Sequence, residues 1–318
     1  MTDPVQPIVV TMGDPAGIGP EVALRAWPAL AHLPVRLIGN RALLERVGAR
    51  ISAPVPPDLI EPAMPGFDAA AVIPGKVAAA CGLAAAACIE DAIAGCRTGR
   101  YAAMVTGPIN KLAIHAAGVP FPGHTEWLAA RCGVAGEVMM LHSPALSVLL
   151  VTCHQALASV AADLVPERIV ARTRLFADAL RRLHGRPPRL AVLGFNPHAG
   201  ESGLFGDEER AIIPAIAELL NLGIDTEGPL PPDTAFTPAN RKRFDGFVCM
   251  YHDQALIPFK ALAFDEGVNV TLGLPIVRTS VDHGTAFDIA WKGKADHRSL
   301  IHAVLLAAGL RPATPCQG

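Results

Sequence analysis

The chain has 318 residues, more than a typical single domain, so we expect two domains or one large α/β unit. Its 27 Lys and Arg residues nearly balance its 29 Asp and Glu residues, and the net charge of −2 argues against a broad basic surface for nucleic acid or an anionic membrane. With 51% hydrophobic but only 5% aromatic residues, the composition is typical of alanine-faced helices packed on aliphatic parallel strands.

The cysteines and the most apolar stretches indicate the compartment. The seven cysteines include no C-x-x-C pair, and an odd number in a chain of this size argues against a disulfide framework. Residues 1–10 lack the basic and apolar regions of a signal peptide. Residues 77–89, the most apolar stretch, are fewer than the roughly 18 residues of a membrane-spanning helix. We therefore expect a cytoplasmic protein with reduced thiols and no membrane partner.

Short aliphatic runs alternate with amphipathic stretches along the chain. The pairs are 7–11 with 20–31, 35–39 with 41–48, 102–106 with 111–117, 146–152 with 166–184, 190–195 with 208–223, and 246–251 with 255–261. The first member of each pair has the length and composition of a buried strand, and the second has helical periodicity. This alternation predicts an α/β architecture with mainly parallel strands.

The glycine-rich segment 13–21 connects the first expected strand to the first expected helix, and Pro20 suits the first helical position. Such a turn can bring backbone N–H groups close to a ligand, but a tight structural turn is an equal alternative. The segment contains no G-x-G-x-x-G, and no acidic residue ends the next strand. A standard Rossmann dinucleotide site is therefore not favoured.

Three histidines stand where expected strands end. His154 follows 148–152, His198 follows 190–195 and His252 follows 247–251. Three imidazoles with open positions would describe a catalytic metal site, and Asp253 or Glu201 could orient the rings. The spacing matches no local metal motif, so hydrogen-bonded loop histidines remain an alternative.

Residues suited to anion binding are spread over the second half of the chain. Thr125 can cap the helix expected at 127–131, whose N-terminus could receive an anion. Lys260, Asn269 and Arg278 supply two cations and an amide that could bind phosphate and carboxylate, with solvated charges as the alternative. A glycine turn at 283–286 precedes Asp288, which could bind a ribose hydroxyl.

The order and spacing of these motifs resemble the 4-hydroxythreonine-4-phosphate dehydrogenases of pyridoxal phosphate (vitamin B6) biosynthesis. The resemblance covers nearly the whole chain. The matching blocks are 13–21, 106–111, 123–126, 196–201, 228–234, 250–254 and 271–286. The first and last blocks are also similar to isocitrate and isopropylmalate dehydrogenases, which share the broader fold.

The resemblance implies two α/β/α lobes with mainly parallel sheets, isocitrate/isopropylmalate dehydrogenase-like, with a cleft between them. We expect residues 1–125 and 285–318 in the first lobe and residues 126–284 in the second. It further implies a homodimer whose active site lies at the subunit interface, so that residues of both chains would bind one metal ion.

The resemblance also implies roles for individual residues. His154, His198 and His252 match the metal ligands, the last expected from the neighbouring subunit. The expected substrate-binding residues are His124, Thr125, Lys260, Asn269 and Arg278. The expected nicotinamide-cofactor residues are Gly228, Asp233, Thr234, His283, Gly284 and Asp288. Asp233 and Lys260 are the candidates for the catalytic base, with Lys111 behind them.

The implied reaction is the oxidation of 4-phosphooxy-L-threonine by NAD or NADP with a divalent metal, which could be zinc, magnesium or cobalt. The product, 2-amino-3-oxo-4-phosphooxybutanoate, is a β-keto acid that decarboxylates to 3-amino-2-oxopropyl phosphate. Two alternatives stay open. One is a related dehydrogenase for a threonate or erythronate 4-phosphate or a cyclic dihydrodiol acid, and the other, more distant, is a phosphate acyltransferase.

Overall fold

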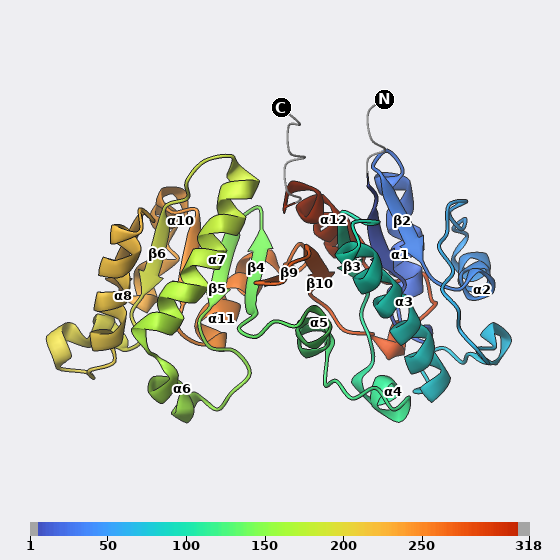
Figure 1. Cartoon of the computed structure of the whole chain (residues 1–318), viewed down its shortest axis with the longest axis horizontal. Helices are drawn as coiled ribbons and strands as arrows, with labels where there is room; N and C mark the ends of the chain where they lie inside the picture. Colours follow the sequence, from blue (N-terminus) through green and yellow to red (C-terminus); the bar gives the residue numbers. More distant parts are fainter. Residues whose placement is uncertain (1–5, 311–318) are drawn as a thin grey trace. The chain divides into compact units, whose positions relative to one another are not determined.

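The computed structural model describes residues 6–310, which form two compact units. The first unit contains residues 6–137 and 274–310, and the second contains residues 138–273. The chain thus enters the second unit once and returns to the first (Figure 1). Both units are α/β, which confirms the fold class predicted from the alternating strand and helix patterns.

The first unit contains four parallel strands in the order β2-β1-β3-β10. Their bounds are β1 Ile8–Thr11, β2 Val35–Ile38, β3 Ala103–Thr106 and β10 Arg278–Val281. All four residues of β1, β3 and β10 are buried, as expected of parallel strands covered on both faces. The helices are α1 Gly19–Leu30, α2 Arg41–Ile51, α3 Ala79–Arg97, α4 Lys111–Ala116, α5 His124–Cys132 and α12 Arg298–Leu310, with 3-10 turns at Ala69–Ala71 and Phe287–Ile289.

Helix α3 is the one helix within residues 6–310 that is long and apolar enough to cross a membrane. Half of its apolar window is buried, and it packs against β1, β3 and α4. A Cβ atom on Gly82 would lie 2.2 Å from the Ala113 carbonyl oxygen, so glycine permits the close approach of α3 and α4. These contacts describe a core helix of the first unit, longer than the apolar stretch 77–89 seen in the sequence.

The second unit contains six strands in the order β9-β4-β5-β8-β6-β7. Their bounds are β4 Val138–Ser143, β5 Leu146–Leu150, β6 Leu190–Leu193, β7 Thr226–Leu230, β8 Gly246–Cys249 and β9 Val268–Leu272. The helices are α6 Leu157–Asp163, α7 Pro166–His184, α8 Glu209–Asn221, α9 Pro232–Ala235, α10 Pro238–Arg243 and α11 His252–Ala263, with a 3-10 turn η2 at Pro197–Gly203.

Strand β4 is antiparallel to both β5 and β9, whereas β5, β8, β6 and β7 are parallel. Strand β4 was not predicted from the sequence. Ser143 pairs with Leu146, so only two residues connect β4 to β5. A connection this short permits only antiparallel pairing, because a parallel crossover needs a dozen or more residues.

The unit boundaries differ from those expected at 125/126 and 284/285, which would have assigned most of α5 and all of β10 to the second lobe. Strand β10 instead pairs with β3, with Arg278 opposite Met104. Helix α5 packs against α3, and the Trp127 indole N–H donates to Glu90 at 2.9 Å. Pairing and packing therefore assign both elements to the first unit.

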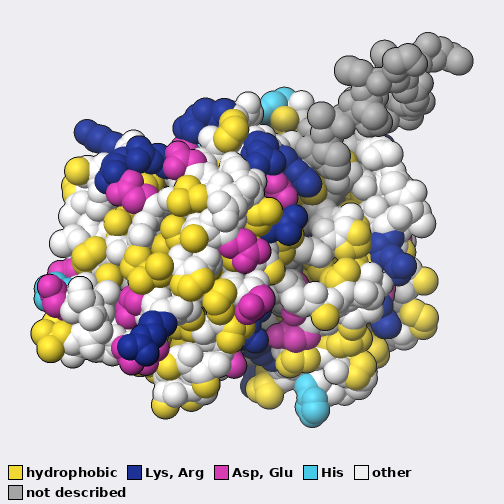
Figure 2. Space-filling model, turned by 60° about the vertical axis from the view of Figure 1, so that its left-hand side comes forward, with side chains coloured by type: hydrophobic (Ala, Val, Ile, Leu, Met, Phe, Trp, Pro, Cys, Tyr) yellow, Lys and Arg dark blue, Asp and Glu magenta, His cyan; other side chains and the backbone are white. Residues whose placement is uncertain are grey.

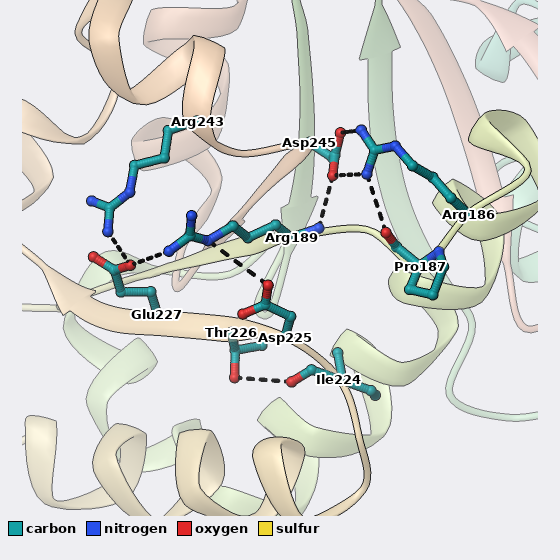
Figure 3. Close-up of polar contacts among 9 residues, drawn as sticks. All are labelled: Arg186, Pro187, Arg189, Ile224, Asp225, Thr226, Glu227, Arg243 and Asp245. Carbon is teal, nitrogen blue, oxygen red and sulfur yellow. Dashed lines mark hydrogen bonds and ion pairs between the residues drawn. The ribbon is translucent and has the colours of Figure 1, made fainter.

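An ion-pair network connects the amino-terminal ends of β6, β7 and β8 (Figure 3). Arg186 donates two hydrogen bonds to Asp245, at 2.6 and 2.9 Å, and Asp245 also accepts from the Arg189 backbone N–H at 2.8 Å. Glu227 accepts from Arg189 at 3.0 Å and from Arg243. Burial alone would raise the pKa of Asp245, but the hydrogen bonds from Arg186 and from the Arg189 backbone outweigh burial and lower this pKa.

Charged side chains are mixed on the face that Figure 2 shows, where Lys and Arg lie among Asp and Glu. Several ion pairs of the second unit connect groups from different parts of the chain, including Arg168 with Asp163 and Arg189 with Asp225. Positively and negatively charged side chains are thus interspersed on this face and do not form separate patches of one sign.

Candidate active site

The three predicted metal-ligand histidines follow three strands that are neighbours in the second unit. The strands lie in the order β5-β8-β6, and both pairings are parallel. His154 follows β5, His252 follows β8 and His198 follows β6. Because the carboxyl ends of parallel strands meet at one edge of a sheet, all three histidines belong to the same edge, where ligands of α/β proteins usually bind.

His154 and His252 are in contact within one chain. Their ring centroids lie 5.5 Å apart, with the ring planes inclined by 47°. His252 is the first residue of α11, and its Nδ1 donates to the Asp253 carboxylate at 2.7 Å. Because Nδ1 is used in that hydrogen bond, Nε2 of His252 is available to a ligand. Asp253 thus orients the ring, which is the role that the sequence suggested for it. The resemblance had implied that His252 comes from the neighbouring subunit, whereas here it lies beside His154 of its own chain.

His198 lies on the turn η2, in an unusual backbone conformation. Residues 198–202 all have positive φ, which is 53° at His198 and 42° at Glu201. The His198 ring lies near Phe205, with centroids 6.1 Å apart. Within residues 6–310, no three His, Cys, Asp or Glu side chains come close enough together to hold a metal ion. The structure therefore brings together two of the three predicted ligands.

Glu209 anchors the start of the His198 turn. Its carboxylate is buried and accepts the backbone N–H groups of Phe195 and Asn196 at 2.9 and 2.8 Å. The Asn196 amide donates to Glu209 at 2.9 Å and to Glu208 at 2.7 Å. Glu201 was the acidic residue expected to orient a ring, but the carboxylates that bond to the start of this turn are those of Glu208 and Glu209, at the beginning of α8. Acidic residues are common near helix N-termini, so the sequence contains no signal that singles out Glu209 for this role.

Gln254 connects the ends of the strands that precede the histidines. Its side-chain oxygen accepts the Met250 N–H at 2.6 Å, and its amide donates to the Gly194 carbonyl at 2.8 Å. The Thr152 hydroxyl donates to the Met250 carbonyl at 2.7 Å. The ends of β5, β6 and β8 are thus held together by buried hydrogen bonds. Gln254 lies in the 250–254 block, but its connecting role was not predicted.

A pocket of about 160 Å³ lies wholly within the first unit, at the carboxyl ends of β3 and β10. Its lining residues are Thr106, Gly107, Pro108, Ile109, Lys111, Gly123, His124, Arg278, Ser280, Val281, His283 and Gly284. Arg278 is buried and donates from Nε and Nη2 to the Thr106 hydroxyl, at 3.2 and 2.7 Å. Burial lowers the pKa of Arg278 to about 10, so the side chain remains cationic at neutral pH.

His124 is the neutral partner of Arg278 in this pocket. Burial, and then the nearby Arg278 cation, lower the pKa of His124 well below its usual value. Its Nε2 atom is buried, with no hydrogen-bond partner among the described residues. Thr125 follows on α5, and Gly123 is the N-cap residue, so Thr125 does not cap this helix as predicted.

The glycine-rich turn 13–21 packs against the loop that lines this pocket. The Asp14 N–H donates to the Pro108 carbonyl at 2.8 Å, and a Cβ atom on Gly13 would lie 2.5 Å from the same oxygen. Asp14 is buried and accepts the Ala16 N–H at 2.8 Å. Burial raises the pKa of Asp14 to about 6, although hydrogen bonds from the Ala16 and Asn110 backbones act against the rise. The close contacts agree with the alternative of a tight structural turn.

The other expected site residues are divided between the units. His283, Gly284 and Asp288 belong to the first unit, and Asp288 is exposed. In the second unit, Lys260 is on α11 with its Nζ 5.2 Å from the Phe264 ring centroid, and Asn269 is a half-buried residue of β9. Gly228 is in β7, and the exposed Asp233 and Thr234 are in α9. A Cβ atom on Gly228 would lie 2.3 Å from the Val192 carbonyl oxygen, at a φ of 158°.

The family model of the pyridoxal phosphate biosynthetic protein PdxA matches residues 33–307. The chain belongs to the PdxA family. A 4-hydroxythreonine-4-phosphate dehydrogenase of Bradyrhizobium diazoefficiens is 45% identical over 337 residues, which cover 97% of this chain and 98% of the relative. The crystal structure of the Klebsiella pneumoniae enzyme of that name has a TM-score of 0.84 and 42% identity, covering 96% of this chain and 99% of the other. These findings confirm the family and the oxidoreductase class predicted from the sequence.

The chain is also similar to a relative that is named for a different substrate. A D-threonate 4-phosphate dehydrogenase of Cupriavidus necator is 44% identical over 331 residues, covering 98% of each chain. The two relatives are nearly equally similar to this chain. Overall sequence identity therefore does not distinguish an amino-acid substrate from one without the amino group. Both enzyme names refer to a phosphorylated hydroxy acid.

Proposed function

We propose that this protein catalyses the NAD- or NADP-dependent oxidation of 4-phosphooxy-L-threonine to 2-amino-3-oxo-4-phosphooxybutanoate, which decarboxylates to 3-amino-2-oxopropyl phosphate in pyridoxal phosphate biosynthesis. The observation that carries the proposal is membership of the PdxA family over nearly the full length. The cationic pocket at Arg278 and the paired histidines 154 and 252 supply chemistry for a phosphate and for a metal-assisted oxidation.

The histidine pair fits a divalent metal that takes imidazole ligands, such as zinc or cobalt, whereas magnesium, the third candidate, prefers oxygen ligands. Two imidazoles with centroids 5.5 Å apart can direct one nitrogen each at a common ion, and Asp253 fixes the His252 ring through Nδ1. His198, at the same edge of the sheet, is the third proposed ligand. A bound metal would stabilise negative charge on the substrate alcohol oxygen and on the enolate formed in decarboxylation.

In this proposal the remaining residues bind the substrate and move its proton. Arg278 and His124 hold the phosphate, with Thr125, Lys260 and Asn269 as further substrate contacts. Asp233 or Lys260 accepts the hydroxyl proton. The nicotinamide cofactor contacts the Gly228–Thr234 and His283–Asp288 regions. Such positioning lowers the barrier because the carbinol carbon is held against the cofactor before hydride transfer. We further propose a cytoplasmic homodimer with the active site at the subunit interface.

The test is absorbance of the reduced nicotinamide, with purified protein, NAD or NADP, and zinc, cobalt or magnesium added or withheld. With 4-phosphooxy-L-threonine we expect reduced cofactor to form only when metal is present. D-Threonate 4-phosphate is the matched alternative substrate, because it keeps the phosphate and lacks the amino group. A larger kcat/KM for the threonate would replace the proposed substrate by the alternative that the Cupriavidus relative represents.

A further inference from the structure

The pocket at Arg278 is of a size for one small group. Its volume of about 160 Å³ is less than the roughly 300–1,000 Å³ of pockets that enclose drug-sized ligands. All its lining residues belong to the first unit. A phosphate group with its ester carbon suits such a space, whereas a dinucleotide does not.

The lining side chains favour an anion. Lys111 and Arg278 bring two positive charges, and none of the residues that line the pocket is Asp or Glu. Arg278 is held in place by its two hydrogen bonds to Thr106. A planar guanidinium fixed in this way can bind two oxygens of one phosphate.

His283 lines this pocket and has one ring nitrogen without a hydrogen-bond partner among the described residues. Its Nδ1 lies 3.1 Å from the Gly284 carbonyl oxygen. Since a carbonyl oxygen only accepts hydrogen bonds, Nδ1 must carry the proton in this contact. Nε2 of the neutral ring is then an acceptor, and it is buried with no partner among the described residues. Leaving a buried acceptor without a donor is costly, so this atom calls for a ligand that supplies a hydrogen.

We propose that His283 is a phosphate ligand of this pocket, alongside Arg278, Lys111 and His124, and that its Nε2 accepts a hydrogen bond from a protonated phosphate oxygen. This assigns His283 to the substrate's phosphate instead of the cofactor region where the sequence had suggested it. The assignment deepens the proposed function and rests on it for the identity of the phosphate ester.

The chemical consequence is discrimination between phosphate and sulfate. At about pH 8 inorganic phosphate keeps one proton on oxygen, which it can donate to Nε2, whereas sulfate has none to donate. A phosphate ester would make the same hydrogen bond as its monoanion, which keeps one proton on oxygen. Arg278 and Lys111 attract both anions by charge, so the preference for phosphate comes from the imidazole.

The experiment is calorimetric titration of the full-length protein with inorganic phosphate and, separately, with sulfate at about pH 8. We expect the native protein to bind phosphate more tightly. His283→Asn keeps an amide that can donate to the Gly284 carbonyl but has no atom at the Nε2 position. It should weaken phosphate binding about tenfold, the effect of one buried hydrogen bond, and leave sulfate binding unchanged.

Two comparisons make this test decisive. Lys111→Gln, the charge control, should weaken phosphate and sulfate binding equally, and retained sulfate binding by His283→Asn shows that the variant is folded. Equal losses for both anions in His283→Asn, or no loss for phosphate, would overturn the proposal.

Competition experiments identify the source of the phosphate. We expect 4-phosphooxy-L-threonine, but not NAD, to displace inorganic phosphate from the native protein. Displacement by NAD would assign the pocket to the cofactor and overturn the substrate assignment. These binding measurements need no turnover, so a failure of the dehydrogenase assay and a failure of the His283 assignment are distinguishable.

Discussion

The side chains of the candidate site differ in how far they are buried. His154 and His198 are exposed, and His252 is half-buried, whereas Arg278 is buried and bound to Thr106. Exposed ligand side chains can be removed without leaving a cavity, because no core packing depends on them. Their substitution therefore tests chemistry more cleanly than the substitution of Arg278 would.

His198→Ala should lower kcat by at least about 100-fold, beyond the 10- to 100-fold typical of residues that only orient a metal ligand. The free energy of unfolding should change by less than about 0.5 kcal/mol, since the side chain is exposed. Steady-state kinetics and urea denaturation measure the two quantities. His115→Ala, at an exposed position of α4, is the control and should keep full activity. Near-normal turnover of His198→Ala would contradict its role as a ligand.

Asp14→Asn should change how stability depends on pH. The pKa of Asp14 in the folded protein is raised from about 3.8 to about 6, so its contribution is fully present below pH ~4 and is lost as pH rises through 6. A shift of about two units corresponds to roughly 3 kcal/mol. The asparagine variant should therefore gain stability relative to the native protein between pH 4 and pH 7. Thermal denaturation over that range measures it, and parallel curves for the two proteins would refute the expected titration.

At the scale of elements, the candidate site depends on how strand ends are held. Gln254 bonds to backbone groups at the ends of β8 and β6, and Glu209 in α8 holds the backbone that leads into η2. The positive-φ run from His198 to Ser202 is costly for non-glycine residues, so it persists only where neighbouring contacts stabilise it. Glu209 supplies such contacts for residues 195 and 196.

Glu209→Ala should lower the free energy of unfolding by about 2–4 kcal/mol, because two backbone N–H groups lose a charged acceptor. It should also lower kcat, since the turn that carries His198 loses its anchor. Glu209→Gln keeps one oxygen for both N–H groups and should restore most of the stability. Glu208→Ala is the matched control, because Glu208 accepts from the Asn196 side chain, whereas the backbone N–H groups of Phe195 and Asn196 donate to Glu209. Equal stabilities of the Glu209→Ala and native proteins would show that the anchor is unimportant.

At the scale of the whole molecule, the question is which histidines share a metal ion. His154 and His252 are in contact within one chain, and no third ligand joins them among the described residues of that chain. In the proposed homodimer, His198 of a second subunit would then complete the site. The resemblance suggested the other arrangement, with His252 from the second subunit.

Mixing inactive variants distinguishes these arrangements. Random reassociation of His198→Ala with His252→Ala subunits should restore about a quarter of native activity, because half the dimers are mixed and each mixed dimer has one intact site. Mixing His154→Ala with His252→Ala should restore none, since every site would lack one member of the pair. Activity is measured after denaturation and refolding of equal amounts. Recovery in the second mixture would show that His154 and His252 act from different subunits.

The sequence by itself determined the alternation of strands and helices, the family, and the position of each candidate ligand just after a strand. These features are local, since the strand pattern, the helix pattern and the motif words each occupy a few neighbouring residues. Strand β5 was predicted, but β4 was missed; one of its two partners, β9, lies far along the chain.

Only the tertiary structure decided the pairing order β5-β8-β6, which brings His154 beside His252, and the placement of α5 and β10 in the first unit. It also revealed the anchoring roles of Glu209 and Gln254 and the burial of Asp14. Each of these depends on contacts between segments distant in the chain. Such contacts follow from which strands pair and which surfaces are buried, and no short stretch of sequence specifies either.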